Sequence, residues 1–557
     1  MLLLLLSCVP VFIDHSEPTD TDTDAADSAS SDTDTDTDTD TEPDTGVDTI
    51  DGEAEGRPVF SPDGGAFVGE VTVTLSSTVS EQSVSYCVAR PDQVCTLEPY
   101  TEPITLDGSA VVHLQAGEFR EARSFVEVDA EVLAFASDVP VMLFWTAQAE
   151  PDSDEEVAMG LDVFSADGGR TDFTSAPADS GRARLRLRGS STFGLSKPSY
   201  DMELWAPDSS SDRASEMLGM PADGDWVLYA PYYFDEALIR NPLGYALSNA
   251  IGRYAPRTRS VELFVAEWGR SVDMDDYRGV YILTEEIERG ADRVDIAAID
   301  PDDDSEPEIT GGYLFKRDRT GDGEYGFSAG LAGGRFSFDQ NLVWVDPDET
   351  ERTSAQEAYL AAVLDDFAWA LAASDHTSPY TGLHYSEIID VPSWIDHHIL
   401  NVLFKNPDAF RLSGYLHKDR EGLVASGPLW DLDRTAGASD GRATYPTWWD
   451  ASNQTADTTY VFEHGWYDGL FDDPAFRAAY WSRWEELLAG DLSAASLDAR
   501  IDTLAGELSE AGPRNASRWG TANFSGKVSD LKRWMRDRVE WIEACIEDNA
   551  DPRDCTG

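Results

Sequence analysis

The sequence predicts a multidomain α+β protein, and three observations lead to this prediction. At 557 residues, of which 41% are hydrophobic and 11% aromatic, the chain is long enough for more than one packed core. Short strand patterns separated by turn residues fill residues 57–118, which indicates a small all-β sandwich. From residue 181 to about residue 550, strand patterns give way to amphipathic helices, which indicates one mixed domain.

The first 56 residues are not expected to join either core. Met1 to Cys8 is an apolar run ending in Leu-Ser-Cys, too short to span a membrane. It lacks the basic residues of a signal peptide but resembles a bacterial lipobox, so residues 1–13 are expected to be a lipoprotein-type anchor lipidated at Cys8. Ordinary secretion is the alternative. Residues 14–56 repeat Asp and Thr without lysine or arginine and predict a disordered, self-repelling linker.

The charge of the chain restricts its partners. A net charge of −65 repels nucleic acid and anionic membranes, so we expect no nucleic-acid partner and membrane contact only through Cys8. A protein partner of basic character fits this charge. Binding of cell-wall polysaccharide is a further possibility that the sequence leaves open.

The cysteines indicate an extracytoplasmic protein of the bacterial cell envelope, either lipid-anchored or secreted. Besides Cys8, the chain holds one close pair in a predicted hairpin, Cys87 and Cys95, and a second pair around the end of the last helix, Cys545 and Cys555. Two local disulfides would account for these four residues and are typical of an oxidising compartment. Four free thiols are the alternative.

The all-β part divides into two stretches. Residues 57–118 resemble the sandwich module found at the C-terminus of chitobiases, although a cysteine-bearing hairpin replaces the usual turn of that module. Residues 119–180 also show strand patterns, with a buried strand at 139–145. They are expected to connect the sandwich to the mixed domain.

The stretch from residue 391 to residue 433 carries the candidate chemistry. Residues 391–405 predict a helix that ends before Pro407, because proline disfavours the α conformation in the residue before it. Asp408 is then on an exit loop, and a hairpin of strands 413–417 and 423–425 leads to Asp431 and Asp433. Such a hairpin brings Asp408 and Asp431 close enough to share a divalent cation. The alternative is a turn cap at Asp408 and a solvated strand end.

A second candidate element lies near the start of the mixed domain. Residues 182–188 alternate arginines with apolar residues, which predicts a strand, and a turn of small residues follows at 189–194. The next strand carries Lys197. A small-residue turn with a nearby lysine is one way to cover and neutralise nucleotide phosphates. An ordinary hairpin is the alternative.

Several of these segments, taken in order, resemble the spore coat protein H (CotH) kinase family. The similar segments are Arg188-Gly-Ser-Ser-Thr192 with Lys197-Pro-Ser-Tyr200, Arg240-Asn241, Arg278 to Glu286, Gly311 to Lys316, Asn406-Pro-Asp408, and Gly427-Pro-Leu-Trp-Asp-Leu-Asp433. The sequence departs from the family pattern at Ser190, where asparagine is usual, and at Lys316, where an acidic residue is common.

The resemblance implies an atypical protein-kinase-like domain of two lobes over residues 181–550, which phosphorylates Ser or Thr of proteins with ATP and Mg²⁺ or Mn²⁺. It implies that Asp408 is catalytic and that Asp431, Asp433 and Asn406 hold the metal. The residues expected to bind or surround the nucleotide are Lys197, Arg188, Ser190, Ser191, Arg240 and Glu285. For Arg240, a structural salt bridge, with Glu285 as a candidate partner, is the alternative. A catalytically inactive kinase-like fold that serves as a surface-anchored scaffold is the rival function.

Overall fold

The computed structural model describes residues 56–146, 151, 156–166, 169–189, 194–208, 210–267, 269–321, 324–331, 336–348, 350–449, 460–521, 523–548 and 551–555. Residues 54–557 form one compact unit. The predicted anchor at Cys8 and all but the last residue of the predicted linker lie outside the described residues.

Two small sheets open the compact unit. One has the strand order β1 (Pro58–Ser61), β3 (Val71–Ser77), β6 (Ile104–Leu106), and the other has the order β2 (Gly65–Phe67), β8 (Phe119–Glu127), β7 (Ala110–Ala116), β4 (Val84–Ala89), β5 (Glu98–Pro99). Buried residues of both sheets, among them Phe60, Val73, Leu114 and Phe125, form one core. The disulfide predicted between Cys87 and Cys95 is present. The boundary expected at residue 118 falls between β7 and β8, which pair with each other.

A closed barrel of seven strands follows. Its order is β10 (Val141–Thr146), β11 (Val157–Phe164), β13 (Asp179–Arg188), β14 (Ser199–Trp205), β17 (Asp225–Tyr229), β19 (Tyr277–Glu285), β18 (Thr258–Glu267). The parallel pairing of β10 with β18 closes it. Apolar side chains alternate into its interior, which is why residues 182–188 show a period of two. Residues 119–180 thus supply two barrel strands, a role that the sequence did not predict.

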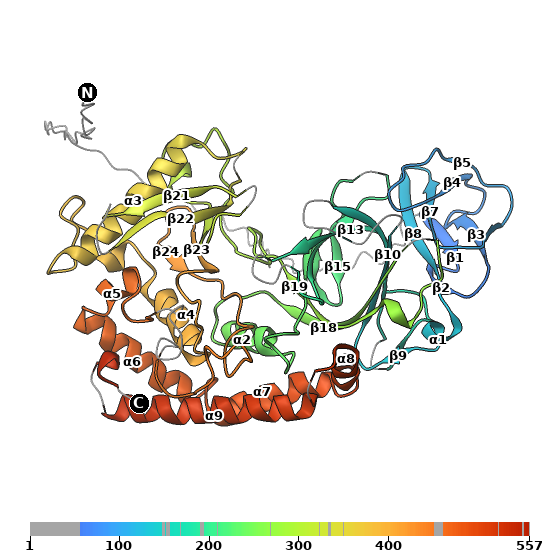
Figure 1. Cartoon of the computed structure of the whole chain (residues 1–557). Coiled ribbons are helices and arrows are strands. Elements are labelled where there is room, and N and C mark those ends of the chain that lie inside the picture. Colours follow the sequence, from blue (N-terminus) through green and yellow to red (C-terminus); the bar gives the residue numbers. More distant parts are fainter. Residues whose placement is uncertain are drawn as a thin grey trace, which may run out of the picture. The chain divides into compact units, whose positions relative to one another are not determined.

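Short elements decorate the barrel. They are α1 (Ala130–Leu133), the two-stranded pair β9 (Ala136–Ser137) and β12 (Thr171–Asp172), and the two-stranded pair β15 (Ser215–Met217) and β16 (Met220–Asp223). Figure 1 shows α1 and β9 beside β10 and β18.

A second five-stranded sheet forms the opposite side of the mixed domain. Its order is β21 (Gly326–Gly330), β22 (Ser337–Asp346), β20 (Tyr313–Arg317), β23 (Gly414–Lys418), β24 (Val424–Ser426), and all its pairs are antiparallel. The helix α3 (Ser354–Ala372) covers one face of it (Figure 1). This helix begins with a capping box between Thr353 and Gln356. The hairpin predicted at 413–425 is confirmed as β23–β24.

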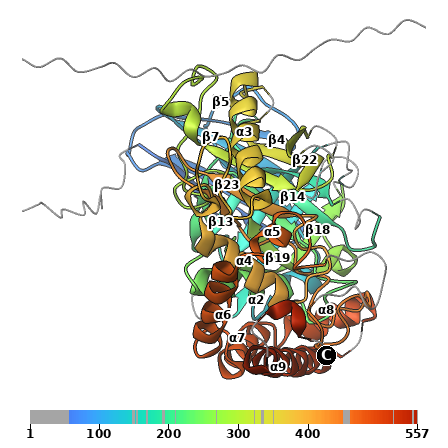
Figure 2. The ribbon, with the colours of Figure 1, turned by 90° about the vertical axis from the view of Figure 1, so that its left-hand side faces the viewer.

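Helices complete the chain. They are α2 (Arg240–Ala250), α4 (Val391–Leu403), α5 (Trp466–Leu470), α6 (Pro474–Leu488), α7 (Ala494–Glu507), α8 (Ala511–Trp519) and α9 (Phe524–Asp548). In Figures 1 and 2, α4 lies between α3 above and α9 below. One apolar core runs through these helices and the second sheet. The helix predicted at 391–405 is confirmed as α4, which ends two residues earlier, and the amphipathic helices expected toward residue 550 are present as α3, α6, α7 and α9.

The structure therefore confirms a mixed α+β, multidomain chain. It combines small N-terminal sheets, a seven-stranded barrel, a second sheet and C-terminal helices. Among the described residues, no helix is both long and apolar enough to cross a membrane.

Candidate active site

The loop after α4 presents Asp408 through a small amide network. Asn406 donates from Nδ2 to Asn401 Oδ1 at 2.9 Å, and its own Oδ1 accepts the backbone N–H of Asp408 at 3.0 Å. Lys405 adopts a left-handed φ of 53°, which turns the chain out of the helix. Asn406 therefore fixes the loop that carries Asp408, and its side-chain oxygen is already used in doing so.

The carboxylate of Asp408 is held by arginines. The two terminal nitrogens of Arg442 donate to its Oδ1 and Oδ2 at 2.9 and 2.7 Å, the fork geometry of a strong arginine–carboxylate pair. Arg411 adds a further ion pair. Arg442 is itself buried and donates from Nε to Asp440 Oδ2 at 2.8 Å. Nothing in the sequence singled out Arg442, because its partner is 34 positions away.

Asp431 and Asp433 lie together after β24. Asp431 has a left-handed φ of 59°, and the next backbone N–H, that of Leu432, donates to Asn241 Oδ1 at 2.7 Å. Asp431 is open to solvent, whereas Asp433 is buried, and the two carboxyl groups lie close enough to influence each other's pKa. Burial and the neighbouring charge of Asp431 raise the pKa of Asp433 well above its usual value. Protein atoms around the Asp431 carboxyl group displace water and disfavour its charged form. This desolvation, together with the charge of Asp408, raises the pKa of Asp431.

The Arg240-Asn241 pair supports this loop from α2. Arg240 forms a buried ion pair with Asp235, with Nη1 2.6 Å from Oδ1. It also donates to the carbonyl oxygens of Thr435 and Ala436 at 2.9 and 3.1 Å. The structure thus places a structural salt bridge at Arg240, but its partner is Asp235, and the suggested partner Glu285 is wrong.

Glu285 belongs to a different network. It is fully buried at the end of β19 and accepts hydrogen bonds from Arg257 Nε at 2.6 Å and Arg293 Nη1 at 2.8 Å. Tyr254 donates to its second oxygen at 3.3 Å. In this arrangement Glu285 orders the segment that precedes β18 and the loop that follows β19.

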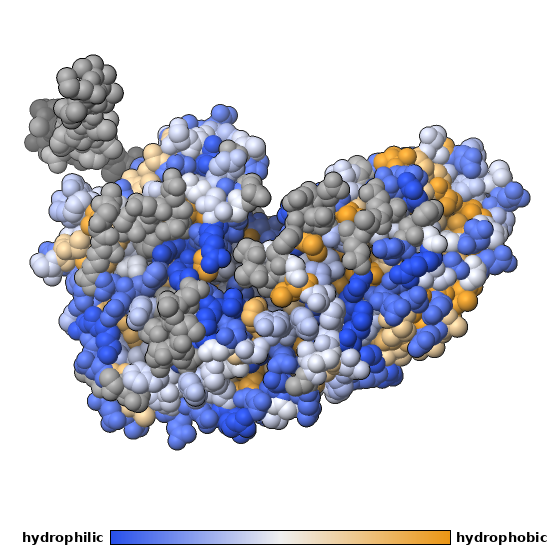
Figure 3. Space-filling model, in the orientation of Figure 1, coloured by the Kyte–Doolittle hydropathy of each residue, from blue (hydrophilic) through white to orange (hydrophobic). Residues whose placement is uncertain are grey.

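Two cations adjoin the segment that carries Asp431. Arg188, at the end of β13, lies over the ring of Trp430 at 5.6 Å and contacts Glu286 at 2.9 Å. Lys316 of β20 donates to Glu324 at 2.6 Å and faces Tyr415 of β23, whose ring is 6.4 Å from that of Trp430. Figure 3 shows the surface hollowed between the barrel side and the second-sheet side. The predicted turn residues Ser190 and Ser191 lie outside the described residues.

Lys197 lies where the barrel meets α8. Its ammonium is buried and donates to the carbonyl oxygens of Pro231, at 3.1 Å, and of Val280, and to Asn515 Oδ1, at 3.0 Å. Burial lowers its pKa well below the usual value. The ammonium thus joins the barrel to α8, and contact with ATP phosphates stays a prediction.

A second acidic group lies at the end of the barrel. Asp223, Asp225 and Glu288 have carboxylate oxygens within 4.8 Å of one another. Arg293 already pairs with Asp223 at 3.0 Å. Burial, followed by neighbouring carboxylates, raises the pKa of Asp225 to about 7 and that of Glu288 to about 9. Sequence reasoning missed this group, since its members come from β16, β17 and the loop after β19.

The chain was compared with known families and with curated proteins. The family model described as CotH kinase protein matches residues 185–542, which is more than half of the chain. A comparison with curated proteins gave no match. The matched range runs from β13 to α9 and includes Arg188, Asp408, Asp431 and Asp433.

Proposed function

Since the chain belongs to the CotH kinase protein family, we propose that it is an atypical kinase that transfers the γ-phosphoryl group of ATP to a Ser or Thr hydroxyl of a protein. The observation that carries this proposal is that Asp431 and Asp433 lie on one loop after β24, with Asp408 close enough for its charge to raise the pKa of Asp431. The two disulfides favour an oxidising compartment, so the proposal places this activity outside the cytoplasm.

The carboxyl pair has the chemistry of a divalent-metal site. Two crowded carboxylates with raised pKa values repel each other, and a hard cation such as Mg²⁺ or Mn²⁺ relieves that repulsion while accepting their oxygens as ligands. Asp431 and Asp433 are thus the residues that would hold the metal. When bound, the metal would neutralise charge on the phosphates of the nucleotide.

The other residues position the reactants. Asp408 is proposed to orient the acceptor hydroxyl, and Arg442 fixes the direction of its carboxylate. Arg188 and Lys316 supply positive charge on the two sides of the Trp430 segment, where they suit phosphate oxygens. Phosphoryl transfer through a loose transition state depends on this positioning and charge neutralisation more than on a strong base.

Asp431→Asn tests the proposal. Binding of ATP is measured by titration calorimetry in Mg²⁺ and in Mn²⁺, and we expect at least a tenfold loss of metal-dependent affinity with an unchanged or higher unfolding midpoint. The matched control is Asp502→Asn, which alters an exposed aspartate of α7 paired with Lys532. Wild-type affinity in the Asp431 variant would remove this residue from the metal site.

An inactive scaffold is the second candidate, and one observation favours it. Both oxygens of Asp408 are occupied by Arg442, an arrangement that leaves this carboxylate less available to an acceptor hydroxyl. An inactive scaffold is expected neither to bind nor to consume ATP with any of a series of divalent metals. Detectable turnover of labelled ATP with a protein acceptor would reject it.

A further inference from the structure

Residues 444–449, which we call the aromatic platform, have their backbone fixed from one side. Lys405 donates from Nζ to the carbonyl oxygens of Tyr445 and Thr447 at 3.0 and 2.7 Å. Trp534 of α9 donates from Nε1 to the carbonyl oxygen of Thr444 at 3.1 Å. Cationic and indole donors thus hold this non-helical segment in one conformation.

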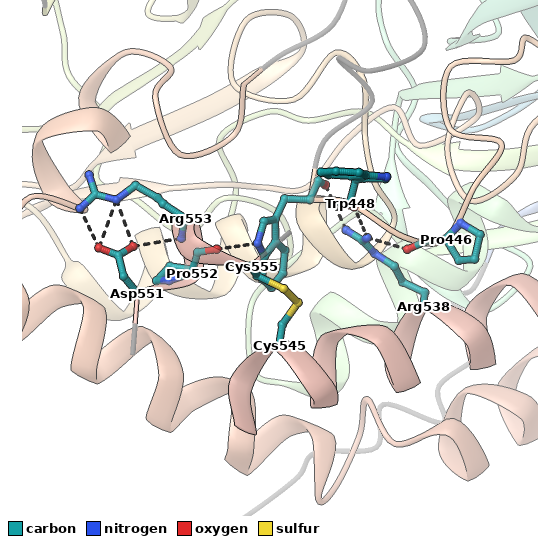
Figure 4. Close-up of a disulfide and its surroundings, with 9 residues drawn as sticks. Pro446, Trp448, Arg538, Cys545, Asp551, Pro552, Arg553 and Cys555 are labelled. Carbon is teal, nitrogen blue, oxygen red and sulfur yellow. Dashed lines mark hydrogen bonds and ion pairs between the residues drawn. A yellow bond between two sulfur atoms is a disulfide. The ribbon is translucent and has the colours of Figure 1, made fainter. Parts of the chain in front are cut away.

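Arg538 of α9 adds the strongest anchor. Its guanidinium is fully buried and donates to the carbonyl oxygens of Pro446 at 2.7 Å, Trp449 at 3.0 Å and Trp448 (Figure 4). A fourth bond, to the carbonyl oxygen of Val402 at 2.6 Å, ties the platform to the last turn of α4. Burying an arginine is costly unless its donors are satisfied, so four carbonyl acceptors indicate a segment built to be rigid.

The residues after α9 support the same platform. Trp449 Nε1 donates to the carbonyl oxygen of Pro552 at 2.7 Å, and the disulfide between Cys545 and Cys555 holds that terminal turn against α9 (Figure 4). The platform is therefore supported by α4, by α9 and by the residues after α9.

Two aromatic rings of the platform face solvent. Tyr445 is 60% exposed and Trp448 is 39% exposed, although their backbone is fixed. Trp448 also has a φ of 69°, a left-handed conformation that is strained for a bulky residue. A rigid segment that accepts backbone strain and still presents large rings to water has the character of a recognition surface.

The platform follows closely in sequence the arginine that holds the proposed catalytic aspartate. Arg442, whose guanidinium grips Asp408, precedes Tyr445 by three residues, so their Cα atoms are at most about 11 Å apart. An extended peptide advances about 3.3 Å per residue. The proposal therefore places the basic side chains several residues from an acceptor Ser or Thr at Asp408.

We propose that the rings of Tyr445 and Trp448 bind arginine or lysine side chains of the acceptor protein, as an extension of the proposed kinase function. Exposed aromatic faces attract cations, and a chain of net charge −65 draws in basic segments over longer range. Cation–π pairs of this kind already occur inside the protein, for example Arg434 over Phe234 at 4.3 Å. The occupant is thus a basic peptide segment that flanks the phosphorylated residue.

The test uses the full chain and fluorescein-labelled peptides that contain one Ser flanked by arginines, with glutamines in place of the arginines in the reference peptide. Fluorescence anisotropy without nucleotide is expected to show tighter binding of the arginine peptide. A double variant, Tyr445→Ala with Trp448→Gly, is expected to lose on the order of tenfold in this affinity. Glycine is chosen at residue 448 because it tolerates the left-handed backbone.

The control is Tyr380→Ala, which removes a 71% exposed ring from the loop after α3 and should bind as the wild type does. Equal binding of the arginine peptide by the double variant and the wild type would overturn the proposal. An equal loss of affinity in the Tyr380 variant would also overturn it. So would an affinity for the arginine peptide that depends only on the salt concentration, between about 50 and about 300 mM, and not on the two rings. Because binding is read without ATP, a chain that fails to use ATP can still confirm or reject the platform.

Discussion

Replacing Arg538 by methionine gives a quantitative test of how the platform is held. The substitution keeps an unbranched apolar side chain within α9 but removes donors to four carbonyl oxygens. A net contribution of about 1 kcal/mol for each hydrogen bond, with the acceptors left in a buried site, predicts a loss of about 3–5 kcal/mol. The cation–π contact with Trp541, at 5.0 Å, disappears as well.

The loss should be local first, because the mixed domain has a large separate core. Hydrogen exchange of the amides of residues 444, 445 and 447–449 is therefore the sensitive assay, and about 4 kcal/mol corresponds to roughly a thousandfold faster exchange. Unfolding in guanidinium chloride, followed by tryptophan fluorescence, reports the global effect. Both measurements are made under oxidising conditions so that the disulfide stays closed.

Arg536→Met is the matched control on the same helix. Arg536 is more than half exposed and pairs with Asp498 at the surface, so its removal should leave both the exchange rates and the unfolding midpoint unchanged. If the two variants behave alike, or if the platform amides of the Arg538 variant exchange as slowly as those of the wild type, the argument for a rigid platform fails.

Three further predictions concern other parts of the structure. Arg240→Met should destabilise the protein by about 3–5 kcal/mol in urea unfolding, because it leaves Asp235 charged and buried; an unchanged midpoint would contradict this. His398 has a folded pKa of about 3, lowered by burial, so the unfolded state binds its proton more readily and stability is lost as pH falls below about 6.5. Replacing it with Asn should flatten the dependence of unfolding free energy on pH by about 1.4 kcal/mol per unit between about pH 6 and pH 4, and parallel curves would refute the assignment. Replacing both Cys545 and Cys555 with Ser should cost about 2–3 kcal/mol of stability under oxidising conditions, and an unchanged unfolding midpoint would contradict this.

Much of the secondary structure of the helical part could be read from the sequence. Residues 391–405 carry apolar side chains at helical spacing and end before Pro407, and α4 spans Val391–Leu403. Where local signals conflict, prediction was weaker. Helix α8 contains Gly512 and Pro513 and was missed, because its stability comes from packing on β19 rather than from its own sequence.

The barrel and parts of the site depended on distant pairing. No local pattern predicts that β10 pairs with β18, because the paired residues Val141 and Glu262 lie far apart in the sequence. Periodicity predicts strands but not their partners. For the candidate site, short sequence motifs singled out Asp408 and Asp431, whose roles stay predictions. The surroundings of Arg442 and Lys316 are set by tertiary contacts that the sequence does not predict. The same holds for the buried position of Lys197.

The docking of α8 on the barrel adds a connection between the barrel and the rest of the mixed domain. The chain leaves the barrel after β17 to form α2, leaves it again after β19 toward the second sheet, and returns at the end through α8. Asn515 accepts the Val280 N–H at 3.0 Å and the ammonium of Lys197, and Arg514 grips the buried Glu262 at 2.6 Å. A single proteolytic cut after β19 would thus leave both halves bound to each other. Relative motion of the barrel and the second sheet is therefore limited by the contacts of α8 as well as by the connecting chain.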